Sequence, residues 1–193
     1  MPLCYGGGIK SLEQIKRIIS LGVEKISLSY SAINDPDLIS EASQHVGSQS
    51  IVVVIDTMKK GWSGHYIVFT HNGLKNTGLK TFDFVKNVEK LGAGEIILNS
   101  IERDGSMLGY DFELIDAVMK YINIPITVLG GAGSREDITR LMKRYGIVGA
   151  AAGSLFVFKG RYRAVLINYP NTKEKKELLD FTSDIKRPDE NFL

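Results

Sequence analysis

The sequence predicts an α/β fold built around a parallel sheet, because apolar runs typical of buried strands alternate with amphipathic helical patterns. The strand-like runs lie at residues 3–5, 25–28, 50–55, 95–99, 126–129 and 149–152. The helical patterns lie between them, at residues 12–21, 35–46, 81–91, 112–121 and 135–145. Strands that are apolar on both faces and separated by helices of this length are typical of a parallel sheet covered by helices.

The chain carries an internal repeat built on two glycine-rich turns. Each turn follows an apolar strand, at residues 6–8 and 130–131, and each precedes a helix that closes at a further glycine, Gly22 or Gly146. The corresponding glycines of the two copies are separated by the same offset of 124 residues. Because backbone amides at a helix N-terminus favour a phosphate, the repeat predicts two phosphate cradles and a substrate with a phosphate at each end.

The repeat and the number of βα units predict a (βα)8 TIM-type barrel that is only partly present. Six units can be counted, so two are missing from the front. We expect residues 1–170 to form units three to eight of an incomplete barrel, and residues 171–193 to form a helix near 173–181 and a frayed tail. The chain is then either a fragment of a barrel of about 250 residues, or its open edge is filled by another chain or by its own tail.

The composition is typical of one cytoplasmic domain with neither a nucleic-acid nor a membrane partner. The 193 residues are 44% hydrophobic and 24% charged, enough for a substantial core, and the net charge of +2 is nearly neutral. We find no secretory leader and no apolar segment of spanning length. The one cysteine, Cys4, fits a reducing compartment and is expected to be a small buried strand residue rather than a reactive thiol.

Polar residues at the carboxyl ends of the predicted strands are the candidates for chemistry, since these ends carry the active site of a parallel barrel. Asp56 follows the apolar run at residues 52–55. It is predicted to be a general acid or base, with a helix cap or loop ion pair as the structural alternative. The acidic residues around Arg103, in the loop at residues 102–106, are either a solvated charge cluster or a ligand contact.

The other titratable residues point to no metal site and no cofactor. His45, His65 and His71 lack the spacing of metal ligands. Residues 59–76 interrupt the alternation of strands and helices, and we interpret them as a small hairpin that decorates the strand ending near Asp56. Lys25 lies at the start of a strand, at the opposite end of the barrel, where an ion pair or the lining of a passage is expected.

A set of short motifs runs through the chain from Pro2 to Phe158. They are GGGI at residues 6–9, NDP at 34–36, GSQ at 47–49, VID at 54–56, GLKNTG at 73–78, GAGEI at 92–96, SIERDG at 100–105, GYD at 109–111 and GGAG at 130–133. Together these motifs resemble the cyclase subunit of imidazole glycerol phosphate synthase, in histidine biosynthesis. The resemblance implies a glutaminase partner that delivers ammonia. It also implies conversion of a ribulosyl formimino carboxamide ribotide into imidazole glycerol phosphate and an aminoimidazole carboxamide ribotide.

The resemblance also implies three sets of site residues. The catalytic set is represented by Asp56, which matches one of the family's two catalytic aspartates. The residues implied to bind substrate phosphates are Gly8 and Ser29 at one site, and Asp104, Gly105, Gly131, Gly153 and Ser154 at the other. The residues implied to line the ammonia passage are Lys25, Glu95 and Gln49, the last as an interior polar residue of the barrel.

Three departures from the family pattern limit the activity that the resemblance implies. The family's second catalytic aspartate lies on the first strand, which this chain lacks, so the chain by itself is expected to be inactive. Ser29 and Tyr30 replace the usual Asn-Thr, which would narrow the first phosphate site, and Glu102 replaces the usual Asp. These changes resemble cyclase-like amidotransferase subunits that modify a nucleotide sugar for surface polysaccharide. Two alternatives to the histidine-pathway function therefore stand: a subunit that modifies a nucleotide sugar, and a non-catalytic remnant that only binds phosphate compounds.

Overall fold

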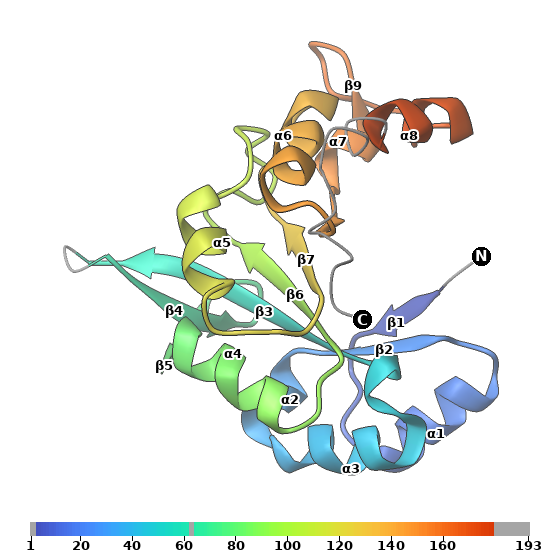
Figure 1. Ribbon diagram of the computed structural model, residues 1–193, viewed down its shortest axis with the longest axis vertical. Helices are drawn as coiled ribbons and strands as arrows, with labels where there is room; N and C mark the ends of the chain where they lie inside the picture. The colour runs from blue at the N-terminus through green and yellow to red at the C-terminus, as the bar shows by residue number, and fades with distance from the viewer. Residues whose placement is uncertain (1–2, 62–63, 180–193) are drawn as a thin grey trace, which may run out of the picture.

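A parallel sheet of six strands forms the centre of the computed structural model, which describes residues 3–61 and 64–179 (Figure 1). In their order across the sheet, the strands are β1 (Cys4–Gly6), β2 (Lys25–Leu28), β3 (Ile51–Lys60), β6 (Glu95–Ser100), β7 (Ile126–Leu129) and β8 (Gly149–Ala150). This order follows the chain, as consecutive βα units produce. In the described part of the chain, β1 and β8 do not pair with each other, so the sheet is an incomplete barrel, as predicted.

The connecting helices are α1 (Leu12–Ser20), α2 (Tyr30–Asn34), α3 (Asp37–Val46), the 3₁₀ segment η1 (Ser48–Ser50), α4 (Thr81–Lys90), α5 (Phe112–Val118) and α6 (Arg135–Tyr145). Five of them, α1, α3, α4, α5 and α6, lie within the ranges that the apolar spacing predicts, and α2 and η1 are additional. The single helix expected at residues 35–46 is instead preceded by a separate short helix, α2. Pro36 explains the break, because proline disfavours helical backbone at the residue before it and lacks an amide hydrogen.

The core lies between the sheet and the helices, on one face of the sheet. Ile26, Ile51, Ile55, Ile96 and Leu98 are completely or almost completely buried there, against apolar residues of α1, α3 and α4. Along β2 and β7 every second residue is only half-buried. These residues are only half-buried because an open sheet leaves the inner face of the barrel partly exposed.

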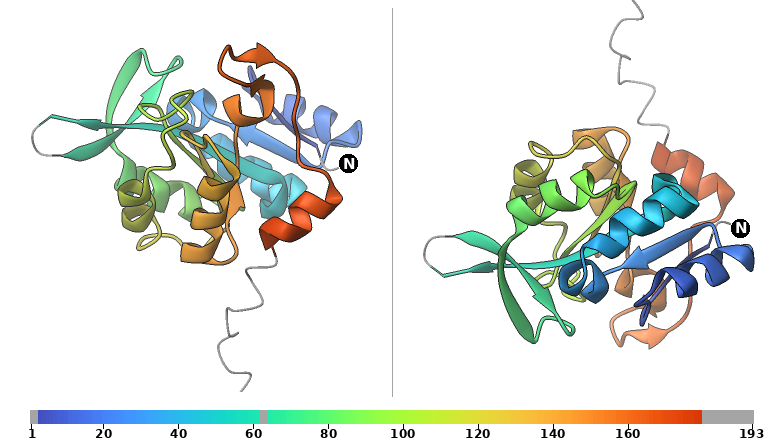
Figure 2. Two further views of the ribbon diagram at one scale, coloured as in Figure 1. Left: turned by 90° about the horizontal axis from the view of Figure 1, so that it is seen from above. Right: turned by 90° about the horizontal axis from the view of Figure 1, so that it is seen from below.

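A hairpin extends the sheet beyond its parallel part. β3 continues to Lys60 and pairs in antiparallel fashion with β4 (His65–Thr70), which pairs with β5 (Lys75–Lys80). Figure 2 shows β3 and β4 projecting from the rest of the molecule. The parallel pairing of β3 with β6 ends at Thr57, so Asp56 lies near the end of the parallel part and within the strand, rather than after it.

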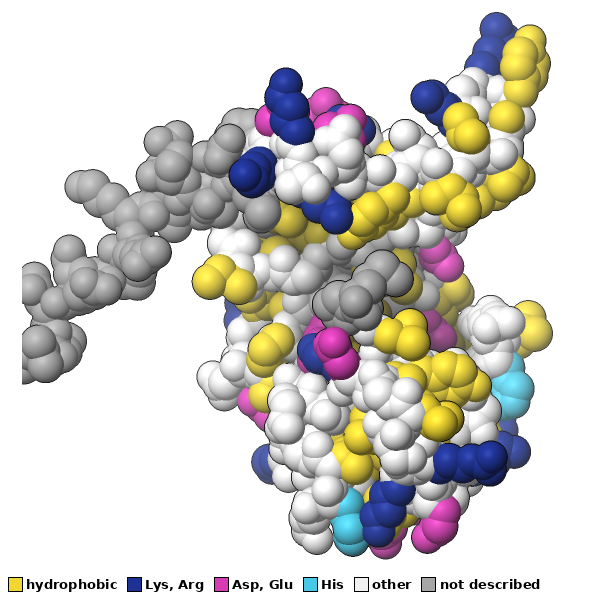
Figure 3. Space-filling model, turned by 90° about the vertical axis from the view of Figure 1, so that its right-hand side faces the viewer, with side chains coloured by type: hydrophobic (Ala, Val, Ile, Leu, Met, Phe, Trp, Pro, Cys, Tyr) yellow, Lys and Arg dark blue, Asp and Glu magenta, His cyan; other side chains and the backbone are white. Residues whose placement is uncertain are grey.

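The last described elements pack beside α6. They are α7 (Ser154–Val157), the hairpin strands β9 (Phe158–Lys159) and β10 (Ala164–Val165), and α8 (Thr172–Leu179). Arg135 of α6 forms an ion pair of 2.6 Å with Glu174 of α8. Figure 3 shows apolar side chains gathered at the top of the molecule, where the β9–β10 hairpin projects. The expected helix near 173–181 lies in α8 as far as Leu179, and the expected tail lies outside the described residues.

Cys4 is exposed, so its predicted burial is wrong. The reason is its position on β1, a strand at the edge of the sheet. Partial desolvation raises the pKa of the Cys4 thiol, which keeps the less nucleophilic protonated form at neutral pH. Within residues 3–61 and 64–179, no helix has the length and hydropathy needed to cross a membrane.

Candidate active site

A cavity of about 330 Å³ opens at the carboxyl ends of the first three strands. Its walls are formed by the glycine turn after β1, the residues after β2, Asp56 of β3 and the turn between β4 and β5. The lining residues are Gly7, Gly8, Ile9, Lys10, Ser27, Leu28, Ser29, Tyr30, Ser31, Val54, Asp56, His71 and Asn72. Three predicted site residues, Gly8, Ser29 and Asp56, therefore share one cavity.

The glycine turn has a backbone that other residues rarely adopt. Gly7 and Gly8 have φ angles of 107° and 74°. A Cβ atom on Gly6 would lie 1.9 Å from the hydroxyl oxygen of Ser27, so the turn also approaches β2 too closely for a side chain. The turn leads into α1, whose N-cap Ser11 accepts a hydrogen bond from the Gln14 amide. The result is the strand, glycine turn and helix start that the sequence predicts as a phosphate cradle.

Asp56 is oriented by an asparagine that the sequence analysis did not select. Asn99 Nδ2 donates a hydrogen bond of 2.8 Å to Asp56 Oδ1, and the two residues are paired in the register of β3 and β6. Asn99 is only 8% exposed, and among the described residues its Oδ1 atom has no hydrogen-bond partner. The side chain that contacts Asp56 is thus an uncharged donor, not the ion-pair partner of the structural alternative.

His71 and Asn72 are two residues of the cavity that sequence reasoning missed. His71 was considered only as a metal ligand, yet it lies in the cavity wall with Asp56. Both residues have φ angles of 55°, in the left-handed region. The sequence His71-Asn72-Gly73 between two alternating strands is a signal for such a turn, since asparagine, histidine and glycine tolerate this backbone better than other residues.

Residues of the second predicted phosphate cradle also come together, but away from the first cavity. A Cβ atom on Gly105 would lie 3.9 Å from the hydroxyl oxygen of Ser154, so these residues of separate loops are neighbours. Gly131 packs against the same loop, where its carbonyl accepts a hydrogen bond of 2.7 Å from the Gly109 amide. Gly153 is the N-cap of α7 and has no side chain to satisfy the helix. None of these residues lines the cavity that contains Asp56.

The charged residues beside the second cradle have internal partners. Glu102 accepts a hydrogen bond of 3.1 Å from the Lys59 amide, and Arg103 donates to the carbonyl oxygens of Leu108 and Gly109 at 3.3 Å. The Glu102 contact ties the β3–β4 hairpin to the loop after β6, and the Arg103 contacts lie within that loop. Glu102 and Arg103 thus stabilise the loop. Asp104 is exposed beside them.

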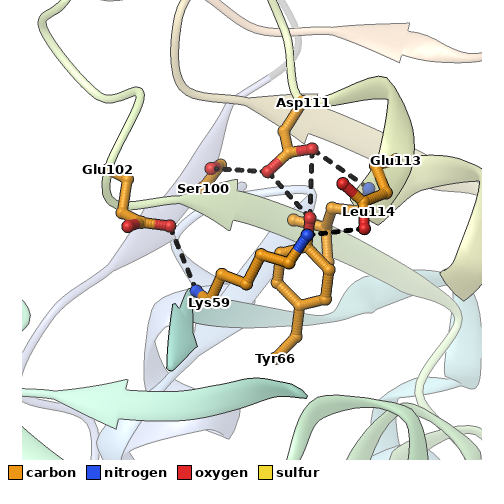
Figure 4. A network of polar contacts seen from close by, with 7 residues as sticks. All are labelled: Lys59, Tyr66, Ser100, Glu102, Asp111, Glu113 and Leu114. Atoms are coloured by element: carbon orange, nitrogen blue, oxygen red, sulfur yellow. Dashed lines mark hydrogen bonds and ion pairs between the residues drawn. The ribbon is translucent and has the colours of Figure 1, made fainter. Parts of the chain in front are cut away.

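Asp111 holds the same region together from the start of α5 (Figure 4). It caps the helix by accepting a hydrogen bond of 3.1 Å from the Leu114 amide, and it also accepts hydrogen bonds from the hydroxyl groups of Tyr66, at 3.2 Å, and Ser100, at 3.4 Å. Burial and the neighbouring carboxylate of Asp111 raise the pKa of Tyr66. Tyr66 therefore stays a neutral donor and fixes the hairpin to α5.

The residues predicted to line a passage lie at the amino ends of the strands. Lys25 Nζ lies 2.5 Å from Glu95 Oε2, and the Thr127 hydroxyl donates a hydrogen bond of 2.6 Å to Glu95 Oε1. Gln49 lies in η1 before β3 and is exposed, so its expected interior position is wrong for the described structure. In the described ranges, no three His, Cys, Asp or Glu side chains are grouped to hold a metal ion.

The fold and this cavity define a class, the barrel-type α/β proteins that bind ligands at the carboxyl ends of parallel strands. Comparison with known sequences identifies the family. The model of the family described as "Histidine biosynthesis protein" matches residues 1–163, and the chain belongs to this family.

Similar proteins are named as the HisF subunit of imidazole glycerol phosphate synthase. The chain is 57% identical over 178 residues to a Leptospira borgpetersenii protein and 51% identical over 180 residues to one from Vibrio vulnificus, both provisionally named as subunit HisF of imidazole glycerol phosphate synthase. It is 43% identical over 173 residues to "Imidazole glycerol phosphate synthase subunit HisF" of Natranaerobius thermophilus. These matches cover 92%, 93% and 90% of the chain, and 70%, 69% and 68% of the relatives. Their names give no support to the nucleotide-sugar alternative.

Proposed function

We propose that the chain is a cyclase-type subunit of imidazole glycerol phosphate synthase, which uses ammonia to form imidazole glycerol phosphate and an aminoimidazole carboxamide ribotide. The observation that carries the proposal is the cavity that brings Asp56 together with Gly8 and Ser29. A phosphate cradle and a carboxylate in one cavity suit a reaction in which a terminal phosphate anchors the substrate while an acid or base acts nearby.

Asp56 is the proposed general acid or base. Asn99 donates to one of its oxygens, Oδ1, which leaves the other, Oδ2, to exchange a proton with substrate. The second phosphate of a bis-phosphorylated ribotide would bind near Gly105, Gly131 and Ser154, where separate loops converge. Asp104 and Gly153 complete this second proposed site. No cofactor is required, since ammonia is the nitrogen donor.

A glutaminase subunit is the proposed source of the ammonia. Lys25 and Glu95, paired at 2.5 Å at the amino ends of β2 and β6, are the proposed lining of the entrance. Replacing Glu95 by Gln would remove this ion pair without changing the side-chain size. If the proposal is right, E95Q reduces the activity supported by glutamine more than the activity supported by ammonium salts. Equal losses would remove these residues from the ammonia path.

The described chain alone is proposed not to complete the reaction. Asp56 is the one carboxylate among the residues that line the cavity, and the sheet is open beside β1. The proposed reaction removes a proton at one position of the substrate and returns a proton at another, so it requires a second acid–base group besides Asp56. A partner segment that closes the barrel would supply it and exclude water from the cavity.

Calorimetric titration with the bis-phosphorylated ribotide tests the proposal. We expect saturable binding to the 193-residue chain, weakened when the ligand lacks one phosphate, and no turnover with ammonium salts. Joining the part of a relative that the chain does not cover should give turnover that Asp56→Asn abolishes. A nucleotide sugar serves as the control ligand. Failure to bind the ribotide would refute the proposed substrate, and turnover by the chain alone would refute the proposed requirement for a partner segment.

A further inference from the structure

His71 and Asn72, which line the cavity, belong to a strained turn at residues 71–73. His71 and Asn72 have φ angles of 55°, and Gly73 has a φ of 82°, so three successive residues adopt left-handed backbone. The turn is closed by a hydrogen bond of 3.2 Å from the Leu74 amide to the His71 carbonyl. Left-handed backbone at a residue with a side chain costs on the order of 1 kcal/mol or more and is concentrated at functional sites.

The imidazole of His71 is held in place from two sides. Its Nδ1 atom lies 3.0 Å from the hydroxyl oxygen of Thr70, which is only 3% exposed. Its ring meets the ring of Tyr30 edge to face, with 5.2 Å between the centroids. When the Thr70 hydroxyl donates to Nδ1, the neutral ring carries its hydrogen on Nε2. Nε2 then presents a donor, and it has no hydrogen-bond partner among the described residues.

The ring contact with Tyr30 places the His71 imidazole beside the first cradle. Tyr30 begins α2 directly after Ser29, and both residues line the cavity with Gly7 and Gly8. Among the lining residues, Lys10 and His71 are the side chains that can carry positive charge, and Asp56 is the one that carries negative charge. A phosphate bound near Asp56 is repelled by that carboxylate, so an additional donor in the cavity wall favours its binding.

We propose that His71 is a phosphate-binding residue, which donates from Nε2 to a phosphate held at Gly7 and Gly8, and that Tyr30 sets the position of its ring. The pair closes one side of the cradle, which restricts the cradle to a terminal phosphate. This inference rests on the proposed function, because it assumes that the first cradle holds a phosphate.

Proton NMR of the imidazole groups tests the inference with inorganic phosphate as the probe. The chain has three histidines, so the imidazole Hε1 region contains three signals. The His71 signal is the one lost in His71→Asn, a variant that also tolerates left-handed backbone. We expect phosphate to shift this signal saturably, while the signals of His45 and His65, which do not line the cavity, stay unchanged.

Affinities measured on the same variants complete the test. His71→Asn should bind phosphate about tenfold or more weakly, as expected for loss of a hydrogen bond to a charged group, whereas His65→Asn should bind like the unaltered protein. Tyr30→Ala, which removes the ring contact, should also weaken binding.

The measurements distinguish a failure of the proposed role of His71 from a failure of the proposed phosphate cradle. If phosphate binds equally well to His71→Asn, the role of His71 is refuted and the cradle stands. If phosphate does not bind to the unaltered chain, the cradle itself is refuted, and the role of His71 with it.

Discussion

Asn99 donates a hydrogen bond of 2.8 Å to Asp56 from the paired position on the neighbouring strand, and it is the contact that fixes the carboxylate in the cavity. Because the contact supplies a donor without a charge, it orients Asp56 without forming an ion pair. Asn99 therefore has a positioning role in the proposed reaction.

Asn99→Asp should destabilise the protein at neutral pH by about 2 kcal/mol, because two carboxylates would meet where a hydrogen bond existed. Repulsion raises the pKa of one carboxyl group in the folded state, so the loss should shrink as the pH falls from 8 to 4.5. Urea unfolding at both pH values measures the effect. Asn87→Asp, on the exposed side of α4, is the control. A loss that is independent of pH would contradict the pairing.

Asp56→Asn should bind inorganic phosphate about fivefold more tightly than the unaltered chain, since a negative charge is removed from the cavity that holds the cradle. Titration calorimetry at low ionic strength measures the change. Asp83→Asn, on α4 and away from this cavity, should have no effect. Unchanged affinity in Asp56→Asn would mean that phosphate binds elsewhere.

Gly130→Ala should cost at least about 3 kcal/mol of unfolding free energy. Gly130 has a φ of 95°, and an added Cβ atom would lie 2.5 Å from the Ser100 carbonyl oxygen. Gly146→Ala is the matched control, because Gly146 has a φ of 71° but no atom within 4 Å of the added Cβ. Its cost should be about 1 kcal/mol, from backbone strain alone. Similar chemical denaturation midpoints for the two variants would contradict this account of the turn.

Asp111→Ala should destabilise the protein by about 2 kcal/mol, since it removes the cap of α5 and leaves the Tyr66 hydroxyl without its acceptor. Asp111→Ser is the comparison, because serine restores an N-cap acceptor but is too short to reach Tyr66. We expect it to recover about half of the loss in thermal or urea unfolding. Full recovery would show that the contact with Tyr66 contributes nothing.

Tyr145→Phe should reduce stability at neutral pH but not at low pH. The Tyr145 hydroxyl donates a hydrogen bond of 2.6 Å to Asp116, and together with Arg144 it lowers the pKa of that carboxyl group. A carboxyl group with a lowered pKa stabilises the fold above its unfolded value, near 3.9, and this stability is lost as the pH falls through the folded pKa. The effect should be small, since Asp116 is partly exposed. Tyr162→Phe, at an exposed tyrosine, is the control, and equal pH dependence in both variants would be inconsistent with this contact.

The parts of the fold determined by local patterns were predictable from sequence. β7 and α6 begin and end at the predicted residues, because an apolar run leads into glycines and then into Ser134, which caps α6. The extension of β3 to Lys60 was missed, since that extension is stabilised by pairing with β4 and not by its own apolar residues.

The site was predictable only in part, for a related reason. Gly8 and Ser29 follow strand ends, and Asp56 lies near the end of the parallel part of β3; the order of elements places these ends together. Asn99 contacts Asp56 because of the register of β6 with β3. His71 reaches the cavity through the backbone of a hairpin turn. A one-dimensional pattern specifies neither the register nor this backbone. The exposure of Cys4 and Gln49 depends on the open edge and the unclosed interior of the sheet, where a closed barrel would cover both.

A crystal structure of the chain with the bis-phosphorylated ribotide tests the central claim most directly. We predict one phosphate within hydrogen-bond distance of the Gly8 amide and the Ser29 hydroxyl, and the middle of the substrate beside Asp56. A ribotide bound elsewhere, with this cavity empty, would contradict the claim.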